Sequence, residues 1–247
     1  MNKAILFVHG LGGDRNTWGN FKNLIDEDER LEYASYFYEY PTGIIRIPII
    51  QQEYGSMHEL SDGLATYIDV ILDAYDEIVL VGHSLGGLII RHYLLNQKTI
   101  HKTTKIAKVI FYAVPQDGSN LAKINCLISW KHPHLEQLCK NSSFLTQLNQ
   151  EWEAAHMNHN YLFEIVIAGE DGIVDKGSVT ANFHQIEPKI VNQKGHITVV
   201  KPRDRDDLSF RILRDFLLPK DTMIQDETPN YSFLHHPTYP KINSILI

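Results

Sequence analysis

Short apolar segments alternate with amphipathic stretches along most of the chain. Apolar runs rich in β-branched and aromatic residues predict strands, at Ala4–Val8, Tyr33–Tyr40, Glu77–Val81, Ile106–Val114, Leu162–Ala168 and Lys189–Asn192. Apolar residues at helical spacing predict helices, at Met57–Tyr75, Ser84–Asn96, Leu145–His156 and Asp207–Leu217. Strands that alternate with helices are typical of a parallel sheet with crossover helices. The pattern therefore predicts an α/β fold with a mostly parallel central sheet and helices on both faces.

Two segments depart from this alternation. Residues 116–160 carry no strand signal, and we expect a helical insertion there, above the ends of the strands. Either the insertion is a lid with an apolar face for an acyl chain, or its apolar residues cap the core; those residues are Leu121, Ile124, Leu127, Ile128 and Trp130. Residues 220–247 are irregular and contain several prolines, which predicts an extended tail. We therefore expect one domain over residues 1–219, followed by this tail.

Charge and composition exclude several classes of protein. The 247 residues include 23 basic and 30 acidic side chains, and no stripe of Lys and Arg indicates a nucleic-acid interface. No apolar run approaches the ~18 residues of a membrane span. The first apolar run is too short for a signal peptide, and Cys126 and Cys139 do not make a disulfide framework. We expect a soluble cytoplasmic protein with no metal and no cofactor, because no metal-ligand spacing or cofactor motif is present. The oligomeric state stays open.

The segment Gly82–Gly87 reads GHSLGG and fits the pattern G-x-S-x-G. It directly follows an expected strand and directly precedes an expected helix, which is the setting of a nucleophile elbow. A sharp turn there projects the serine hydroxyl above the sheet, and the flanking glycines keep side chains out of the turn. The alternative is a glycine-rich turn without chemistry. The context favours Ser84 as a nucleophile.

A second glycine-rich segment, His9–Gly13, ends the first expected strand. In a hydrolase with a nucleophile elbow, the amide after the nucleophile and an amide after an early strand bind the oxyanion. Those amides are here expected to be Leu85 and Leu11. A phosphate-binding loop is the alternative, but the segment fits neither G-x-x-x-x-G-K-[ST] nor G-x-G-x-x-G. We expect His9 itself to brace the loop.

The general base for Ser84 is expected after the last strand, in a loop that can return over the sheet. His196 follows Lys189–Asn192 and meets this requirement. His184 is the rival, but it precedes that strand. His235 and His236 lie in the tail, where exposed histidines are expected. The position in the chain therefore favours His196 as the base.

The acid that orients the base belongs between the serine and the histidine in chain order. Ala168–Val174 follows a strand and contains Asp171 before a glycine and two apolar residues. Other acids compete for the role: Glu170, Asp175 and the earlier Asp117. Asp175 also suits a helix cap before Lys176. We expect Asp171 to be the acid.

Four segments together resemble the lipase-like branch of the α/β-hydrolase superfamily: Phe7–Trp18, Val81–Leu94, Gly169–Ser178 and Gly195–Pro202. The chain is similar to serine esterases, to serine-active-site-containing proteins and to GPI inositol-deacylases, from Lys3 to about Leu218. The resemblance implies that the D-G-x-V segment supplies the acid, which is Asp171. Many members of the family have proline after that valine, where this chain has Asp175. The resemblance also implies a fold trimmed at the N-terminus, because the chain begins at the third strand of the full-length fold.

Together these residues predict a carboxylic ester hydrolase that works through an acyl-enzyme on Ser84. The expected substrate is a small-molecule or lipid ester. Three other readings stay open: a thioesterase, amidase or acyltransferase on the same site, a catalytically silent domain that binds a partner, and a phosphate-binding α/β protein.

Overall fold

Six parallel strands run through the centre of the molecule, in the order β2-β1-β3-β4-β5-β6. The computed structural model describes residues 1–41, 56–119 and 139–219. The strands are β1 (Lys3–Val8), β2 (Tyr33–Tyr38), β3 (Glu77–His83), β4 (Ile106–Tyr112), β5 (Leu162–Ala168) and β6 (Lys189–Val191). Every neighbouring pair is parallel. The predicted fold class is confirmed.

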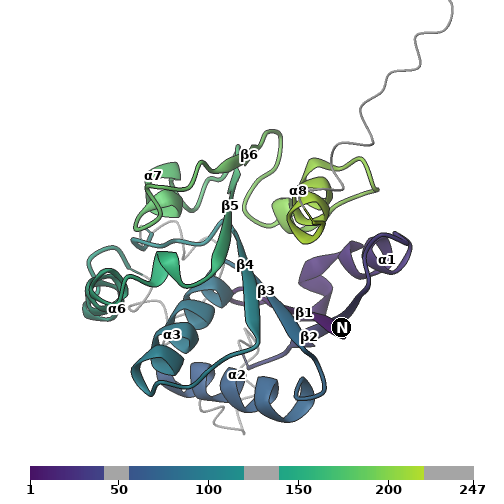
Figure 1. Cartoon of the computed structure of the whole chain (residues 1–247). Helices are drawn as coiled ribbons and strands as arrows, with labels where there is room; N and C mark the ends of the chain where they lie inside the picture. The colour runs from purple at the N-terminus through teal and green to yellow at the C-terminus, as the bar shows by residue number, and fades with distance from the viewer. Residues whose placement is uncertain (42–55, 120–138, 220–247) are drawn as a thin grey trace, which may run out of the picture.

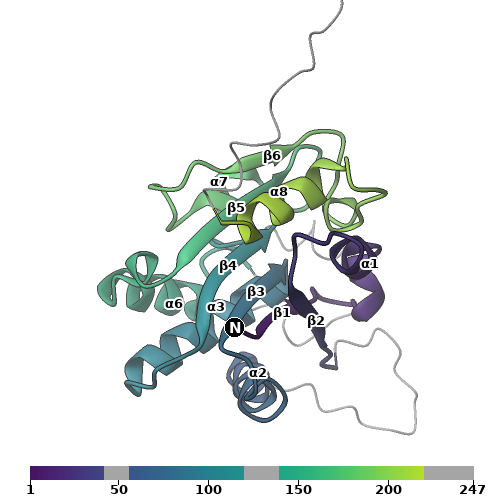
Figure 2. The same cartoon turned by 45° about the vertical axis from the view of Figure 1, so that its right-hand side comes forward.

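Helices cover both faces of this sheet (Figures 1 and 2). One face carries α2 (Met57–Ile71), α3 (Leu85–Thr99) and α6 (Ser143–Ala154), and the other carries α1 (Phe21–Asp26) and α8 (Leu208–Leu217). The strand β1 shows the two-sided burial: Ala4, Leu6 and Val8 belong to the first core and Ile5 and Phe7 to the second. A short helix, α7 (Lys176–Thr180), and three 3-10 helices complete the described structure: η1 (Arg15–Trp18), η2 (Met157–His159) and η3 (Thr198–Val200).

Polar side chains define where the helices begin. The Ser56 hydroxyl accepts a hydrogen bond from the Glu59 amide, and the Glu59 carboxylate accepts one from the Ser56 amide, which makes a capping box at the start of α2. Ser142 caps α6 and Asp207 caps α8 through the same kind of bond to a backbone N–H. The helix starts therefore follow from residues that the sequence places just before each amphipathic stretch.

A buried arginine joins both ends of the connection between β4 and β5 to α3. Arg91 donates to the Gln116 side-chain oxygen at 3.1 Å, just after β4. Its guanidinium lies 4.7 Å from the Trp152 ring of α6, a cation–π contact. Burial lowers the pKa of Arg91 to about 9. The described ends of the 116–160 insertion are thus fixed to the helix that follows Ser84.

The predicted strands and helices are confirmed, with ends that differ by a few residues. The predicted helix Leu145–His156 lies within the insertion as α6. The helix α1 was not predicted, because three buried residues in a six-residue helix leave no periodic pattern. The tail, the middle of the insertion, Cys126, His235 and His236 lie outside the described residues, and the lid and the tail therefore stay predictions.

Candidate active site

Ser84 lies at the sharp turn between β3 and α3, at the carboxyl ends of the central strands. Its backbone has φ 52° and ψ −125°, a conformation that non-glycine residues rarely adopt. The turn is held because the Ser84 amide donates to the Tyr112 carbonyl at 3.2 Å and the Gly87 amide donates to the Ser84 carbonyl at 3.0 Å. The backbone geometry is that of a nucleophile elbow, as the motif predicts.

The glycines of the elbow are required by close backbone contacts. A Cβ on Gly86 would lie 2.1 Å from the Val8 carbonyl oxygen and 2.4 Å from the His9 carbonyl oxygen. A Cβ on Gly82 would lie 2.7 Å from the Gly87 Cα. The start of α3 therefore packs directly on the end of β1, and this contact brings the two glycine-rich segments together.

A chain of hydrogen bonds joins Ser84 to His196 and Asp171. The distance from Ser84 Oγ to His196 Nε2 is 3.0 Å, and that from His196 Nδ1 to Asp171 Oδ2 is 2.9 Å. His196 comes from the loop after β6 and Asp171 from the loop after β5. All three residues are shielded from solvent: the exposed fraction is 9% for Ser84 and 5% for His196, and the Asp171 side chain is 3% exposed. Three residues from distant parts of the sequence thus form one polar line.

The surroundings of Asp171 keep it ionised. Burial alone would raise the pKa of Asp171, but the hydrogen bond and charge of His196 oppose burial, together with the amides of Ile173 and Val174. Asp171 Oδ1 accepts from those amides at 2.8 and 2.9 Å. The net result is a pKa of Asp171 below its usual value. An ionised acid favours the tautomer in which His196 Nδ1 carries the proton and Nε2 accepts from Ser84.

The other candidate residues have different partners. Asp175 Oδ1 accepts from the Ser178 amide at 2.9 Å and caps α7, as its alternative role predicts. Asp117 forms an exposed ion pair with Lys140 at 3.8 Å. Glu170 donates its backbone amide to the Lys194 carbonyl, and His184 is exposed. The structure brings Asp171 and His196 to Ser84, and it does not bring these alternatives there.

The loop that begins at Gly10 lies against Ser84. A Cβ on Gly10 would lie 2.9 Å from the Ser84 Cβ. Neither the Leu11 amide nor the Leu85 amide donates a hydrogen bond to any residue of the described ranges. Two N–H groups without partners in the described ranges, one directly after Ser84 and one in the loop that contacts it, are the arrangement expected for oxyanion donors.

Two neutral side chains that the sequence analysis did not assign support this arrangement. His83 Nε2 donates to the His196 carbonyl at 2.8 Å, and burial, with the nearby His196, lowers the pKa of His83 to about 3. The Tyr40 hydroxyl donates to the His9 carbonyl at 2.5 Å, and its ring stacks on the His9 ring with centroids 4.3 Å apart. His9 Nδ1 in turn donates to the Gly10 carbonyl at 2.9 Å. These contacts agree with the bracing role expected of His9.

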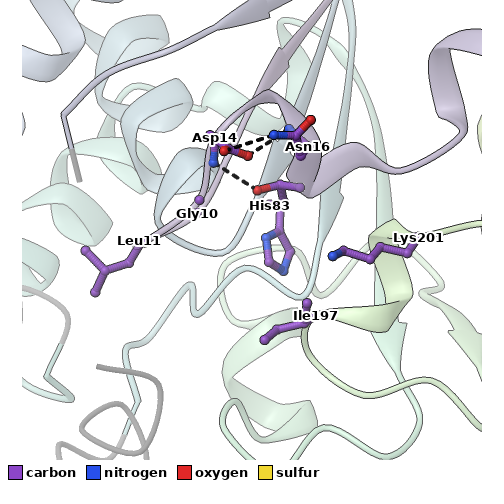
Figure 3. Close-up of a pocket in the computed structure, with 10 residues that line it drawn as sticks. Gly10, Leu11, Asp14, Asn16, His83, Ile197 and Lys201 are labelled. Atoms are coloured by element: carbon purple, nitrogen blue, oxygen red, sulfur yellow. Dashed lines mark hydrogen bonds between the residues drawn. The ribbon is translucent and has the colours of Figure 1, made fainter. Parts of the chain in front are cut away.

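A pocket of about 240 Å³ lies between two loops, and the residues that line it include His83, directly before Ser84, and Ile197, directly after His196. One wall is the backbone of the Gly10–Thr17 segment, and the other comes from Ile197 and Lys201, which follow His196 (Figure 3). His83 lies between the two walls. In Figure 3 the Leu11 side chain points away from the cavity and the Lys201 side chain extends toward it. The pocket therefore has a glycine-rich loop followed by polar residues on one side, and Ile197 with the Lys201 cation on the other.

In the described ranges, no group of three or more His, Cys, Asp or Glu side chains is arranged to hold a metal ion. None of the helices in the described part of the chain is long and apolar enough to cross a membrane.

Comparison with known proteins adds to this geometry. A family model described as "Alpha/beta hydrolase family" matches residues 5–164. Comparison with curated proteins gives no significant match. The fold is similar to that of mature lipase BlEst2 from Bacillus licheniformis, at 17% identity and a TM-score of 0.59, over 87% of this chain and 92% of that one. It is also similar to a monoacylglycerol lipase from Paleococcus ferrophilus, at 17% identity and a TM-score of 0.56, over 87% and 93% of the two chains.

A third neighbour is much longer than this chain. Phospholipase PlaB from Legionella pneumophila is 19% identical with a TM-score of 0.60, over 73% of this chain and 45% of the phospholipase. The chain thus spans less than half the length of that neighbour. At these identities the structural neighbours show a shared fold.

Proposed function

The chain belongs to the alpha/beta hydrolase family, and we propose that it is a serine hydrolase that cleaves carboxylic esters with Ser84, His196 and Asp171 as its catalytic residues. The observation that carries this proposal is the hydrogen-bonded line from Asp171 through His196 to Ser84, at 2.9 and 3.0 Å. These distances are within the range in which a base can accept the proton of a nucleophile.

In the proposed reaction, His196 Nε2 takes the proton of Ser84 Oγ as that oxygen attacks the ester carbonyl. The tetrahedral intermediate collapses when the bond to the alcohol oxygen breaks, and His196 gives its proton to the leaving alcohol. Water then attacks the acyl-enzyme with His196 as the base again. Asp171 remains ionised throughout and stabilises the imidazolium that forms in each step.

The Leu11 and Leu85 amides are the proposed donors to the oxyanion. Both amides lie beside Ser84 without protein partners in the described ranges, and the Leu85 amide is at the first residue of α3, where the helix dipole favours negative charge. Losing one such donor costs about a hundredfold or more in rate in other hydrolases. The lipases and the phospholipase among the structural neighbours support an ester as the substrate. The proposal includes, as its more specific part, that the substrate is a lipid ester.

The first test is the intact mass of the protein after treatment with a fluorophosphonate. We expect one adduct on the wild type and none on Ser84→Ala, because only an activated serine reacts. Ser61→Ala is the matched control, since Ser61 is a buried serine of α2 whose hydroxyl has no hydrogen-bond partner among the described residues. This control should react like the wild type. An adduct on folded Ser84→Ala would overturn the assignment of the nucleophile.

The second test separates the ester reaction from its alternatives. Matched oxygen ester, thioester and amide donors with the same acyl group are compared, with and without an added alcohol as acyl acceptor. We expect the oxygen ester to be hydrolysed fastest. A preference for the thioester or amide, or for transfer to the alcohol, would contradict ester hydrolysis as the reaction but would still agree with the proposed catalytic residues. A folded protein that reacts with no donor and no fluorophosphonate would favour a silent binding domain.

A further inference from the structure

We propose that the pocket beside Ser84 binds the alcohol half of the ester, and that Lys201 selects alcohols that carry a negative charge. This inference rests on the proposed function, because it names the substrate class of that site. It comes from the position of the pocket, from the ion pairs of the loop that follows His196, and from the state of the one acid in the pocket wall.

The position of the pocket matches the place of a leaving alcohol. The proton that His196 takes from Ser84 must be delivered to the alcohol oxygen, so this oxygen has to lie next to His196 Nε2. The pocket lies between the Gly10 loop, which contacts Ser84, and Ile197, which follows His196 in the chain. A group that leaves the ester carbonyl on the His196 side therefore enters this pocket.

Near His196, one basic side chain forms no ion pair with a described residue. Four basic side chains lie between residues 194 and 207: Lys194, Lys201, Arg203 and Arg205, of which Arg205 pairs with Glu27 at 3.7 Å. Asp207 lies 2.8 Å from Lys194 Nζ and 3.8 Å from Arg203 Nε, so it serves two of them. The Lys201 ammonium forms no ion pair with any residue of the described ranges, and its side chain extends toward the pocket (Figure 3). An ammonium group in this position is able to pair with an anion of the substrate.

The backbone that carries Lys201 is held in place. The Lys201 amide donates to the Thr198 carbonyl at 3.0 Å, and the Lys201 carbonyl accepts from Lys194 Nζ at 3.2 Å. Thr198 also fixes the loop near His196, because its hydroxyl accepts from the Gly195 amide at 2.8 Å. The loop that positions His196 thus also positions Lys201.

Asp14 is the acid among the residues that line the pocket, and its oxygens already have donors. Asp14 Oδ1 accepts from the Asn16 amide at 2.8 Å, and Oδ2 accepts from Asn16 Nδ2 at 3.1 Å (Figure 3). These bonds cap η1. An anion in the pocket would therefore meet Lys201 and the Gly10–Gly13 backbone, while the Asp14 carboxylate is directed to its own turn.

The test compares two esters that share one acyl group, the monobutyrates of glycerol and of glycerol 3-phosphate. We expect wild type to prefer the phosphate ester in kcat/KM by about ten-fold, the lower end of a hydrogen bond to a charged group. Lys201→Gln should remove this preference, so that the two esters have kcat/KM values within about two-fold of each other. Lys201→Glu should reverse the preference. Lys98→Gln, an exposed lysine of α3, is the matched control and should behave like wild type.

A binding measurement makes the inference independent of turnover. We expect glycerol 3-phosphate to bind wild type more tightly than glycerol, by titration calorimetry, and to lose this advantage in Lys201→Gln and at high salt. Inorganic phosphate tests whether the anion alone is sufficient; binding of phosphate as tight as that of glycerol 3-phosphate would overturn the alcohol subsite.

The possible failures are distinguishable. Equal turnover of both esters by wild type, with turnover lost in Ser84→Ala, would overturn the role of Lys201 and keep the proposed function. Tight binding of glycerol 3-phosphate that depends on Lys201, without turnover or a fluorophosphonate adduct, would keep an anion site and overturn the hydrolase.

Discussion

The two sides of the candidate site are held by different forces. The serine side consists of Ser84 and the Gly10–Gly13 loop, at the ends of β3 and β1, and its backbone segments are in direct contact through Gly86. The acid–base side consists of Asp171 and His196, on loops after β5 and β6, and it is held by hydrogen bonds from side chains to backbone groups. Close packing fixes the first side, and polar contacts fix the second.

The sheet explains this difference. β1 pairs with β3 over six residues in the middle of the sheet, whereas β5 pairs with β6 over three residues at its edge. Long central pairing leaves no room for adjustment, because both faces are covered by core. Short edge pairing leaves the loops to be positioned by individual hydrogen bonds. Substitutions that crowd the backbone contact on the serine side should therefore abolish folding and activity. Substitutions on the acid–base side should reduce activity by different amounts and leave the fold largely intact.

The largest effect is expected from Gly86→Ala. The added methyl group would meet two backbone oxygens that cannot move away, so we expect little folded protein and no activity. The measurement is soluble yield with circular dichroism and ester turnover. Gly172→Ala is the matched control on the acid–base side, because nothing lies within 4 Å of its added methyl group. Normal folding of Gly86→Ala, or a failure of Gly172→Ala as severe, would break the comparison.

The next effect is expected from Asp171→Asn. The neutral amide removes the charge that stabilises the imidazolium and favours the wrong tautomer of His196, so kcat should fall by about 10³-fold or more. Folding should be largely retained, as shown by the urea midpoint. Asp175→Asn is the control, because asparagine is also a good helix cap. If Asp175→Asn lost as much activity as Asp171→Asn, the choice between the two acids would be wrong.

His83 joins the two sides, and its titration should weaken the fold in acid. Its pKa is about 3 in the folded protein and near 6.5 when exposed. Below pH 6.5 the unfolded chain binds a proton that folded His83 does not, so the free energy of unfolding falls as the pH falls from about 6.5 toward 3. The slope approaches about 1.4 kcal/mol per pH unit for this group.

Urea denaturation of His83→Gln between pH 7 and 4 checks this prediction. Glutamine keeps a donor for the His196 carbonyl but does not titrate, so the loss of stability with acid should be shallower than in the wild type. His92, whose pKa is lowered to about 4 by burial and by His58, contributes in the same direction in both proteins. Identical slopes for the two proteins would contradict the buried neutral state of His83.

The smallest effect is expected from Tyr40→Phe. It removes the hydroxyl that donates to the His9 carbonyl, just before the Gly10–Gly13 loop that carries a proposed oxyanion donor, so kcat should fall by roughly ten-fold with little change in KM. Tyr38→Phe is the control: it removes a buried hydroxyl that donates to the Leu60 carbonyl in α2. The two variants should lose similar stability, and only the first should lose rate. Equal rates in both would show that Tyr40 acts on the fold alone.

Chain order and local turns were sufficient to select the three candidate residues from the sequence. Ser84 lies in a motif between a strand and a helix, and His196 and Asp171 follow strands in the expected order. The sequence favoured Asp171 over Asp175 and offered Asp175 a role as a helix cap, and in the structure Asp171 contacts His196 while Asp175 caps α7. The resemblance to the lipase-like branch of the family also favours Asp171.

His83 and Tyr40 were missed for a physical reason. Their partners lie 113 and 31 residues away, and each contact is made to a backbone carbonyl, which leaves no mark on the sequence of the partner. His83 also occupies the first x of G-x-S-x-G, a position that the motif leaves unrestricted. The pocket was missed in the same way, since Lys201 reaches it only because the chain after β6 returns over the sheet.

The order of the strands also sets the order in which the chain can fold. β1 is complete after residue 8, but its central neighbour β3 begins only at Glu77. During synthesis β1 therefore has only β2 as a neighbouring strand until β3 has been made. Contacts of such long sequence separation form slowly and leave strand edges exposed in the meantime. The contact that fixes the serine side therefore forms only after β3 and the start of α3 have been made, and nascent chains that stop before β3 expose the edge of β1 that β3 later covers.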